Sequence, residues 1–149
     1  MIVIANSSPL IALGRLQKLD VFKQLFGKIS IPVTVYKETV LEATHDGQKR
    51  AILHAIEEGF IEVVRPQSAY AFTRRLHLGE QDVLNAAFDM NADLLILDDT
   101  KARNEAIELG FEVSYTSTVI KGAENRGLIT SYSTLIHQLR AMNIYLPEE

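Results

Sequence analysis

The sequence contains no cysteine, which excludes a disulfide-bonded scaffold and any zinc site built on thiolates. It has no excess of positive charge either, because 15 basic residues face 19 acidic ones and the net charge is -4. This balance argues against a polybasic clamp on nucleic acid, although a local basic patch or a bound metal ion could still engage an anionic substrate. The N-terminal segment has neither a basic leader nor a long apolar run, so we expect a cytoplasmic protein without a signal peptide or membrane span.

The common sequence motifs of α/β enzymes are absent as well. There is no GxGxxG segment, no GxxxxGK[ST] loop and no GxSxG elbow, so dinucleotide-binding, P-loop and serine-hydrolase functions lack support. The histidines show no metal-ligand spacing and are interpreted as mostly surface residues: His45, His54, His77 and His137. Candidate chemistry therefore has to come from oxygen-bearing side chains.

A chain of 149 residues, 47% of them hydrophobic, has the size and composition of one globular domain, which we assign to residues 1–149. Short apolar runs predict strands at residues 1–5, 28–32, 60–66, 92–99 and 111–116, with a further edge strand in the tail at 144–149. Their alternation with helical segments predicts an α/β fold, a three-layer α/β/α sandwich around a central, mostly parallel sheet of about five strands. The strands at 1–5, 92–99 and 111–116 are the expected neighbours.

The segments between these runs have helical period. The first predicted helix takes Ser8 as its N-cap and Pro9 as its first helical residue. The others are predicted at residues 17–27, 33–43, 48–59, 69–78, 78–91, 100–110, 117–128 and 132–143. The helix at 33–43 is expected to bury Val33, Tyr36 and Val40.

Polar residues follow the predicted central strands. Ligands of parallel sheets bind outside the carboxyl ends of the strands, which directs attention to Asn6, to Asp98 with Asp99, and to Thr116. Two adjacent acids repel each other unless a cation or a donor lies between them, and side-chain alternation predicts that one of them faces the crevice. Capping of the following helix is the alternative role for either aspartate, and an Asx turn is the alternative for Asn6.

Two glutamates on predicted helices are further candidates. Glu80 has apolar residues at i+3, i+4 and i+7, so it is predicted to face the sheet; the alternative is a charge that complements the helix dipole. Glu38 lies between two apolar residues of its helix, where a solvated helix edge is an equally good interpretation. Glu42 and Asp82 are nearby acids whose surroundings are more polar or equally consistent with solvent exposure.

Carboxylates that converge at the strand ends would form a hard-oxygen site of the kind that Mg²⁺ or Mn²⁺ prefers. Such a site activates water and stabilises the charge of an in-line phosphoryl displacement. It would also supply the positive charge that an acidic protein lacks for handling RNA.

The sequence resembles the PIN-domain family, metal-dependent ribonucleases that include the VapC-like toxins of toxin–antitoxin pairs. The resemblance is carried by IVIANSSPLIAL, ISIPVTVYKETV, LGEQDVLNAAF, and ADLLILDDTKAR followed by GFEVSYTSTVIKGAENRGLI, which together cover nearly the whole chain. Each motif is short, and their order and spacing carry the argument. The resemblance implies a parallel sheet of about five strands between helices, Mg²⁺ or Mn²⁺ as cofactor, an RNA substrate and an antitoxin partner.

Carried over position by position, the resemblance implies these site residues: Asn6 at the first acidic position, Ser8 as supporting hydroxyl, then Glu38 and Glu80. The last acid falls on Asp99 if it directly precedes the helix, and on Asp98 if strand length decides. The implied metal ligands are Asn6, Glu80, Asp98 and Asp99, with Glu38 as a further catalytic acid and Thr116 in support.

Asparagine at the first acidic position is a departure from the family pattern. It removes a negative charge beside the metal, which implies weakened metal binding and activity. A catalytically inactive PIN-like module that binds RNA or protein is therefore the alternative function. A receiver-like or phosphatase-like domain with Asp98 or Asp99 as phosphoacceptor, near Lys101 and Thr116, is a third reading, although it lacks the acidic pair expected after the first strand.

Basic residues near the motifs are candidates for an RNA-facing rim: Arg74, Arg75, Lys101, Arg103, Lys121 and Arg126. Scattered basic residues are otherwise solubilising. Apolar residues of the early helices could form a homodimer or receive an antitoxin helix, although core packing is the favoured interpretation: Leu16, Val21, Phe22, Leu25 and Phe26.

Overall fold

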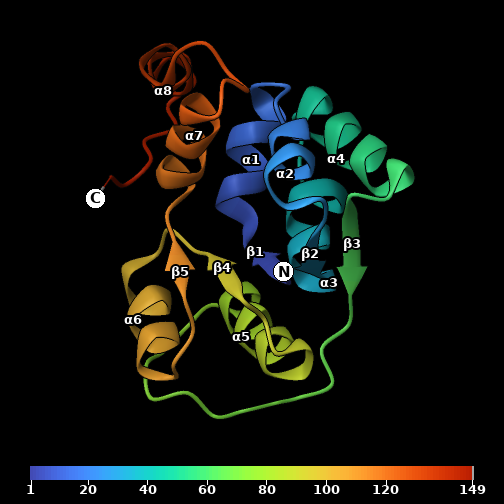
Figure 1. Ribbon diagram of the computed structural model, residues 1–149. Helices are drawn as coiled ribbons and strands as arrows, with labels where there is room; N and C mark the ends of the chain where they lie inside the picture. The colour runs from blue at the N-terminus through green and yellow to red at the C-terminus, as the bar shows by residue number, and fades with distance from the viewer. Residues whose placement is uncertain (149) are drawn as a thin grey trace.

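Five parallel strands form the central sheet of the computed structural model, which describes residues 1–148 (Figure 1). In chain order they are β1 (Val3–Ala5), β2 (Ile29–Pro32), β3 (Ile61–Val64), β4 (Leu94–Ile96) and β5 (Val113–Ser114). Across the sheet the order is β3-β2-β1-β4-β5, and every neighbouring pair is parallel. The predicted adjacency of β1, β4 and β5 is confirmed, and all carboxyl ends lie at one edge.

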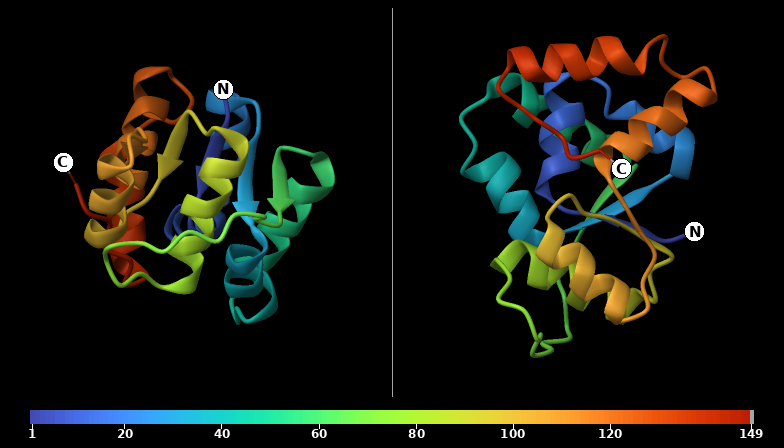
Figure 2. Two further views of the ribbon diagram at one scale, coloured as in Figure 1. Left: turned by 90° about the horizontal axis from the view of Figure 1, so that it is seen from below. Right: turned by 90° about the vertical axis from the view of Figure 1, so that its left-hand side faces the viewer.

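Eight α-helices and one π-helical segment accompany the sheet within residues 1–148. They are α1 (Ser7–Arg15), α2 (Asp20–Phe26), α3 (Val33–Tyr36), η1 (Lys37–Leu41), α4 (Asp46–Glu58), α5 (Leu78–Met90), α6 (Thr100–Glu108), α7 (Thr116–Asn125) and α8 (Tyr132–Ala141). Figure 2 shows α5 and α6 on one side of the sheet and α1, α2, α4, α7 and α8 on the other, which confirms the predicted sandwich. None of these helices is long and apolar enough to cross a membrane.

The strands are buried because helices cover both faces of the sheet. Ile4 of β1, Ile31 of β2 and Leu95 of β4 are fully buried. Near-continuous apolar runs are typical of parallel sheets that are covered on both sides. The apolar residues around α1 and α2 pack into or against the same core, as the favoured interpretation predicted: Leu16, Val21, Phe22, Leu25 and Phe26.

The predicted start of the first helix is wrong by two residues. The N-cap of α1 is Asn6 rather than Ser8. Asn6 keeps an extended backbone, with φ -85° and ψ -173°, so the helical conformation begins at Ser7. Pro9 then occupies the third helical position, still within the first turn, where a backbone N–H has no intrahelical partner to lose.

The predicted helix at 69–78 is also wrong, because residues 65–77 form a loop between β3 and α5 (Figure 1). Side chains on the neighbouring helices accept hydrogen bonds from the loop backbone. Asp89 and Asn85 on α5 and Glu105 on α6 supply these acceptors. Backbone N–H groups that are satisfied in this way do not need helical partners, so tertiary contacts override the local pattern.

Glu105 is a central anchor of this loop. Its side chain is only 3% exposed and accepts hydrogen bonds from the backbone and side chains of both Thr73 and Arg74. The Arg74 guanidinium also makes a two-point contact with Glu108, at 2.7 and 2.9 Å. Burial works to raise the pKa of Glu105, but the hydrogen bonds from Thr73 and Arg74 outweigh it and hold the pKa below its ordinary value.

The predicted helix at 33–43 changes type after its first turn. The N–H of Glu42 donates to the carbonyl of Lys37 at 2.8 Å, the i→i+5 bond of a π-helix. The buried Gln48 of α4 donates its amide to the carbonyl of Thr39 at 2.9 Å, which satisfies an acceptor in the widened turn. Local sequence period does not reveal such a turn, because its stabilising partner comes from another helix.

The buried face of this helix and the C-terminal tail differ from expectation as well. Val40 is buried as predicted, but Val33 and Tyr36 are only half-buried, because α3 turns Val35 toward the core in their place. Residues 144–148 do not form the predicted edge strand; they run back past α7 (Figure 2). The final residue of that prediction lies outside the described residues.

We expect Glu105→Gln to lower the free energy of unfolding by about 2–4 kcal/mol, because it places an amide donor against the donors of Thr73 and Arg74 in a buried site. Urea unfolding at pH 7 measures this effect. Glu108→Gln is the exposed control and should cost under about 1 kcal/mol.

The stabilisation from Glu105 should also be lost as the pH falls through its lowered folded-state pKa, since protonation removes the charged acceptor. The Gln variant should lack this acid-sensitive component. Equal unfolding free energies for the two variants would contradict the role of Glu105 as an anchor.

Candidate active site

Asn6 marks the end of β1 at the carboxyl edge of the sheet. Its backbone N–H donates to the carbonyl of Ile96 at the end of β4, at 3.2 Å. Its side chain makes no capping hydrogen bond to α1, so the amide is not committed to the helix end. The amide lines a hollow of about 320 Å³ together with Ser7, Glu38, His77, Leu78, Gly79 and Glu80.

Glu38 lies in the π-helical segment and reaches the same hollow. The Ser7 hydroxyl donates to Glu38 Oε2 at 2.6 Å, which orients the carboxylate. Gly79 provides the space, because a Cβ there would lie 3.0 Å from Glu38 Oε1 and 3.5 Å from Asn6 Oδ1. The glycine thus lets Asn6 and Glu38 approach the N-terminus of α5 closely.

Glu80 is the residue that connects the site. It lies in the first turn of α5, is 7% exposed, and accepts a hydrogen bond from the backbone N–H of His77 at 3.0 Å. Burial raises its pKa, and the carboxylates of Asp99 and Glu38 raise it further, against the opposing effect of the His77 N–H. The predicted inward orientation of Glu80 is confirmed.

Asp98 connects the end of β4 to the start of α7 through two hydrogen bonds. The Thr116 N–H donates to one carboxylate oxygen and the Thr116 hydroxyl to the other, both at 2.8 Å. Thr116 is fully buried. Burial raises the pKa of Asp98 in spite of these two hydrogen bonds. Both of its oxygens therefore already have a protein partner.

Asp99 is placed differently from its neighbour. It is exposed and is the N-cap of α6, where its Oδ2 accepts the N–H of Ala102 at 3.0 Å. It also lines two hollows that contain Glu80. The first has a volume of about 560 Å³ and the second about 500 Å³. Asp99 therefore caps α6, as the alternative interpretation proposed. The cap uses only Oδ2, so the other carboxylate oxygen can face these hollows.

Three residues at the site were not singled out by sequence reasoning. Ser7, rather than the predicted Ser8, contacts Glu38, while Ser8 is exposed and lines the hollow of Asp98 and Asp99. Gly79 shapes the approach of Asn6 and Glu38, and His77 lines two of the hollows around Glu80. The only sequence signal for these residues is their position beside Asn6 and Glu80.

The predicted basic rim divides into two groups. Arg74 is bound to Glu105 and Glu108, and Arg103 donates to the carbonyl of Leu97 at 3.1 Å while stacking 3.5 Å above the Tyr115 ring. These two guanidinium groups have structural partners. In contrast, Arg75 and Lys101 are exposed and line the 560 Å³ hollow with Glu80 and Asp99, which we call the acidic cleft. These two basic side chains therefore border the acidic residues of the site.

The remaining two predicted rim residues lie elsewhere. Lys121 sits 4.6 Å above the Tyr132 ring in a separate hollow, and Arg126 is at the C-terminal end of α7, opposite the end that meets the sheet edge.

The side chains at the site carry the kind of oxygen atoms that bind a divalent cation, but they do not form a complete set of metal ligands. Carboxylates of Glu38, Glu80 and Asp99, with the amide oxygen of Asn6, are hard-oxygen ligands. No group of three or more acidic or histidine side chains within residues 1–148 is close enough to hold an ion by itself. The predicted convergence is therefore looser than expected: Glu38, Asp98 and Asp99 each share a hollow with Glu80, with room for water ligands.

We expect Glu80→Gln to raise the free energy of unfolding at pH 7 by up to roughly 1 kcal/mol without added metal, because it removes a buried charge that faces Asp99 and Glu38. The folded-state pKa of Glu80 is raised, so wild-type stability should increase as the pH falls from above that pKa towards the ordinary value. Urea unfolding between pH 5 and pH 8 measures this, and the variant should lack the increase. Glu57→Gln, at an exposed position of α4, is the control. A Glu80→Gln variant that is less stable than the wild type at pH 7 would contradict this explanation.

Comparison with known proteins agrees with the fold and the sequence motifs. Residues 2–149 match a family model described as a PIN domain. Among solved structures, the chain is similar to a PilT N-terminus domain protein from the hyperthermophilic archaeon Sulfolobus solfataricus P2, with a TM-score of 0.53 and 20% identity over 83% of this chain and 93% of that one. At this identity the likeness concerns the fold alone, and no curated protein matches in sequence. Because the family model spans nearly the whole chain, the protein belongs to the PIN-domain family.

Proposed function

We propose that this protein is a divalent-metal-dependent endoribonuclease that hydrolyses RNA phosphodiester bonds. PIN domains are in general nucleases, and this membership supports the reaction class. The observation that carries the proposal is the placement of Glu80, buried at the carboxyl edge of the sheet with two further carboxylates raising its pKa. Retaining like charges around a buried acid is costly for the fold and is typical of functional sites.

Mg²⁺ or Mn²⁺ is the proposed cofactor, with Asn6, Glu38, Glu80 and Asp99 as the side chains that would hold it. Asp99 is preferred over Asp98 because both oxygens of Asp98 already accept hydrogen bonds from Thr116. A bound divalent ion supplies positive charge to the phosphate and lowers the pKa of a coordinated water. Asp98 and Thr116 are proposed to brace the end of β4 rather than to bind metal.

The remaining residues of the site orient the acids and the substrate. The Ser7 hydroxyl fixes one oxygen of Glu38, and the His77 N–H fixes one oxygen of Glu80. Arg75 and Lys101 border the acidic cleft and are proposed to contact RNA phosphates on either side of the reacting bond. Arg74 and Arg103 are not expected to contact RNA, because their guanidinium groups are held by the fold.

We further propose that the protein is the toxin component of a toxin–antitoxin pair. The support is the resemblance of its motifs to the VapC-like ribonucleases. The apolar Leu78 is 62% exposed beside Asn6 and Glu38, which suits contact with a protein segment that covers the cleft. An antitoxin bound there would block RNA and metal at once.

Asn6 favours a second candidate, an inactive PIN-like module that binds RNA or protein. The amide lines the acidic hollow in place of a carboxylate, and it brings no negative charge to a cation. This candidate and the nuclease differ in whether the site binds a divalent ion.

We expect saturable Mn²⁺ binding by calorimetry, weakened at least about tenfold in a Glu80→Ala, Asp99→Ala double variant, because each lost carboxylate removes a charged ligand. Glu57→Ala on α4 is the matched control and should bind like the parent. No binding at millimolar Mn²⁺ would overturn the metal site and favour the inactive module.

Asn6→Asp is expected to tighten Mn²⁺ binding by roughly tenfold, since it adds a full charge to the ligand set. Without metal the same change should lower the unfolding temperature, because the new carboxylate faces Glu38 across Gly79. Calorimetry and thermal unfolding with and without Mn²⁺ measure the two effects. Unchanged Mn²⁺ affinity would show that Asn6 does not lie at the metal.

A further inference from the structure

The C-terminal strap, defined as residues 143–148, forms one wall of the 500 Å³ hollow above the acidic residues. The other side of this hollow carries Ser8, Glu80, Asp98 and Asp99. The strap contributes Asn143, Ile144, Tyr145, Leu146 and Pro147, and Ile11 of α1 also lines the hollow. One side of the hollow is therefore acidic and the other largely apolar.

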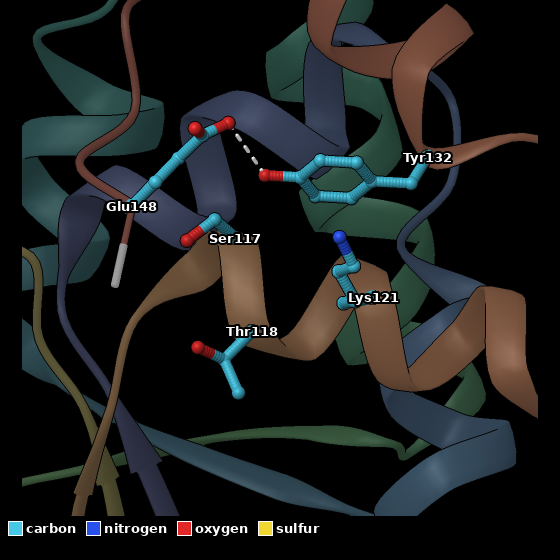
Figure 3. A pocket seen from close by; sticks show the side chains of 5 residues that line it. All are labelled: Ser117, Thr118, Lys121, Tyr132 and Glu148. Atoms are coloured by element: carbon cyan, nitrogen blue, oxygen red, sulfur yellow. Dashed lines mark hydrogen bonds between the residues drawn. The ribbon is translucent and has the colours of Figure 1, made fainter.

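The strap is fixed in place by contacts at both of its ends. Near its start, the Ile144 N–H donates to the carbonyl of Leu139 at 2.9 Å. Near its end, the Ser117 hydroxyl donates to the carbonyl of Pro147 at 2.8 Å, and the Tyr132 hydroxyl donates to Glu148 at 2.7 Å (Figure 3). A segment held in this way presents its side chains in defined positions.

Tyr145 is the side chain that the strap leaves outside. Ile144 and Leu146 are partly buried and pack against the core, whereas Tyr145 between them is 70% exposed. Its aromatic ring thus stands on a fixed backbone at the rim of a hollow that contains Glu80 and Asp99. Burial of its neighbours explains the position of the strap, and residues 1–148 offer the Tyr145 ring no aromatic or cationic stacking partner.

We propose that the strap forms a nucleobase subsite in which Tyr145 stacks on a base of single-stranded RNA whose phosphate lies at Glu80 and Asp99. This inference rests on the proposed ribonuclease function. A nucleotide joins an anionic phosphate to a flat apolar base, and the hollow joins the acidic side chains proposed to hold the cation to an aromatic and aliphatic wall. Stacking is the contact that an acidic protein needs, because it does not depend on positive charge and tolerates any base.

The test measures binding of a fluorescein-labelled oligouridine RNA by fluorescence anisotropy, with Ca²⁺ in place of Mn²⁺ so that binding is separated from turnover. Tyr145→Ala should weaken binding by about tenfold, and Tyr145→Phe should keep it within about twofold, because stacking needs the ring and not the hydroxyl. An abasic oligonucleotide of equal length should bind the wild type and Tyr145→Ala equally. Tyr70→Ala, at another exposed tyrosine, is the control.

A second measurement uses the absence of tryptophan from the chain. Tyr145→Trp introduces a single indole, whose fluorescence should be quenched by the oligouridine and not by the abasic strand. If the wild type binds RNA and Tyr145→Ala binds it equally well, the subsite is overturned while the ribonuclease proposal stands. Loss of binding in Tyr145→Phe as well would overturn stacking as the mechanism. If the wild type binds no RNA, both proposals fall.

Discussion

The parallel pairing of β1 with β4 is the constraint on which the site depends. Ala5 is in register with Ile96, and the bond from the Asn6 N–H to Ile96 extends the pairing beyond the strand. Asn6 and the two aspartates that follow β4 therefore leave the sheet side by side. The helices α1, α6 and α7 all begin at this edge, so their positive ends partly compensate the acidic charge gathered there.

Each carboxylate of the site has one or two dedicated donors, yet the cluster keeps unbalanced negative charge. Glu38 has the Ser7 hydroxyl, Glu80 has the His77 N–H, and Asp99 has the N–H of Ala102. These single donors orient the acids without neutralising them. The raised pKa of Glu80 reflects its burial first and then its acidic neighbours, which is the state that a divalent cation would relieve. The fold thus gives up stability at the position where the proposed metal site needs charge.

Arginines that are adjacent or similarly placed in the sequence have unrelated roles. Arg74 closes the loop onto α6 through Glu105, whereas Arg75, the next residue, is exposed at the cleft. Both arginines lie in the loop at residues 65–77, which is held by hydrogen-bond acceptors on α5 and α6. The local sequence pattern predicted a helix in the place of this loop. A basic residue near a motif is thus a weak predictor of RNA contact until the partners of its side chain are known.

The sequence by itself determined the five strands, the sandwich, the family and the inward position of Glu80, because apolar period and motif spacing are local properties of the chain. It did not determine the loop at residues 65–77 or the path of the C-terminal tail. Only the tertiary structure decided which aspartate is bound to Thr116, which serine touches Glu38, and that Gly79 makes room for both Glu38 and Asn6. It also decided that Tyr145 stands at the rim of the acidic hollow. The physical reason is that each of these outcomes depends on hydrogen bonds and close contacts between segments far apart in the chain, which no local pattern encodes.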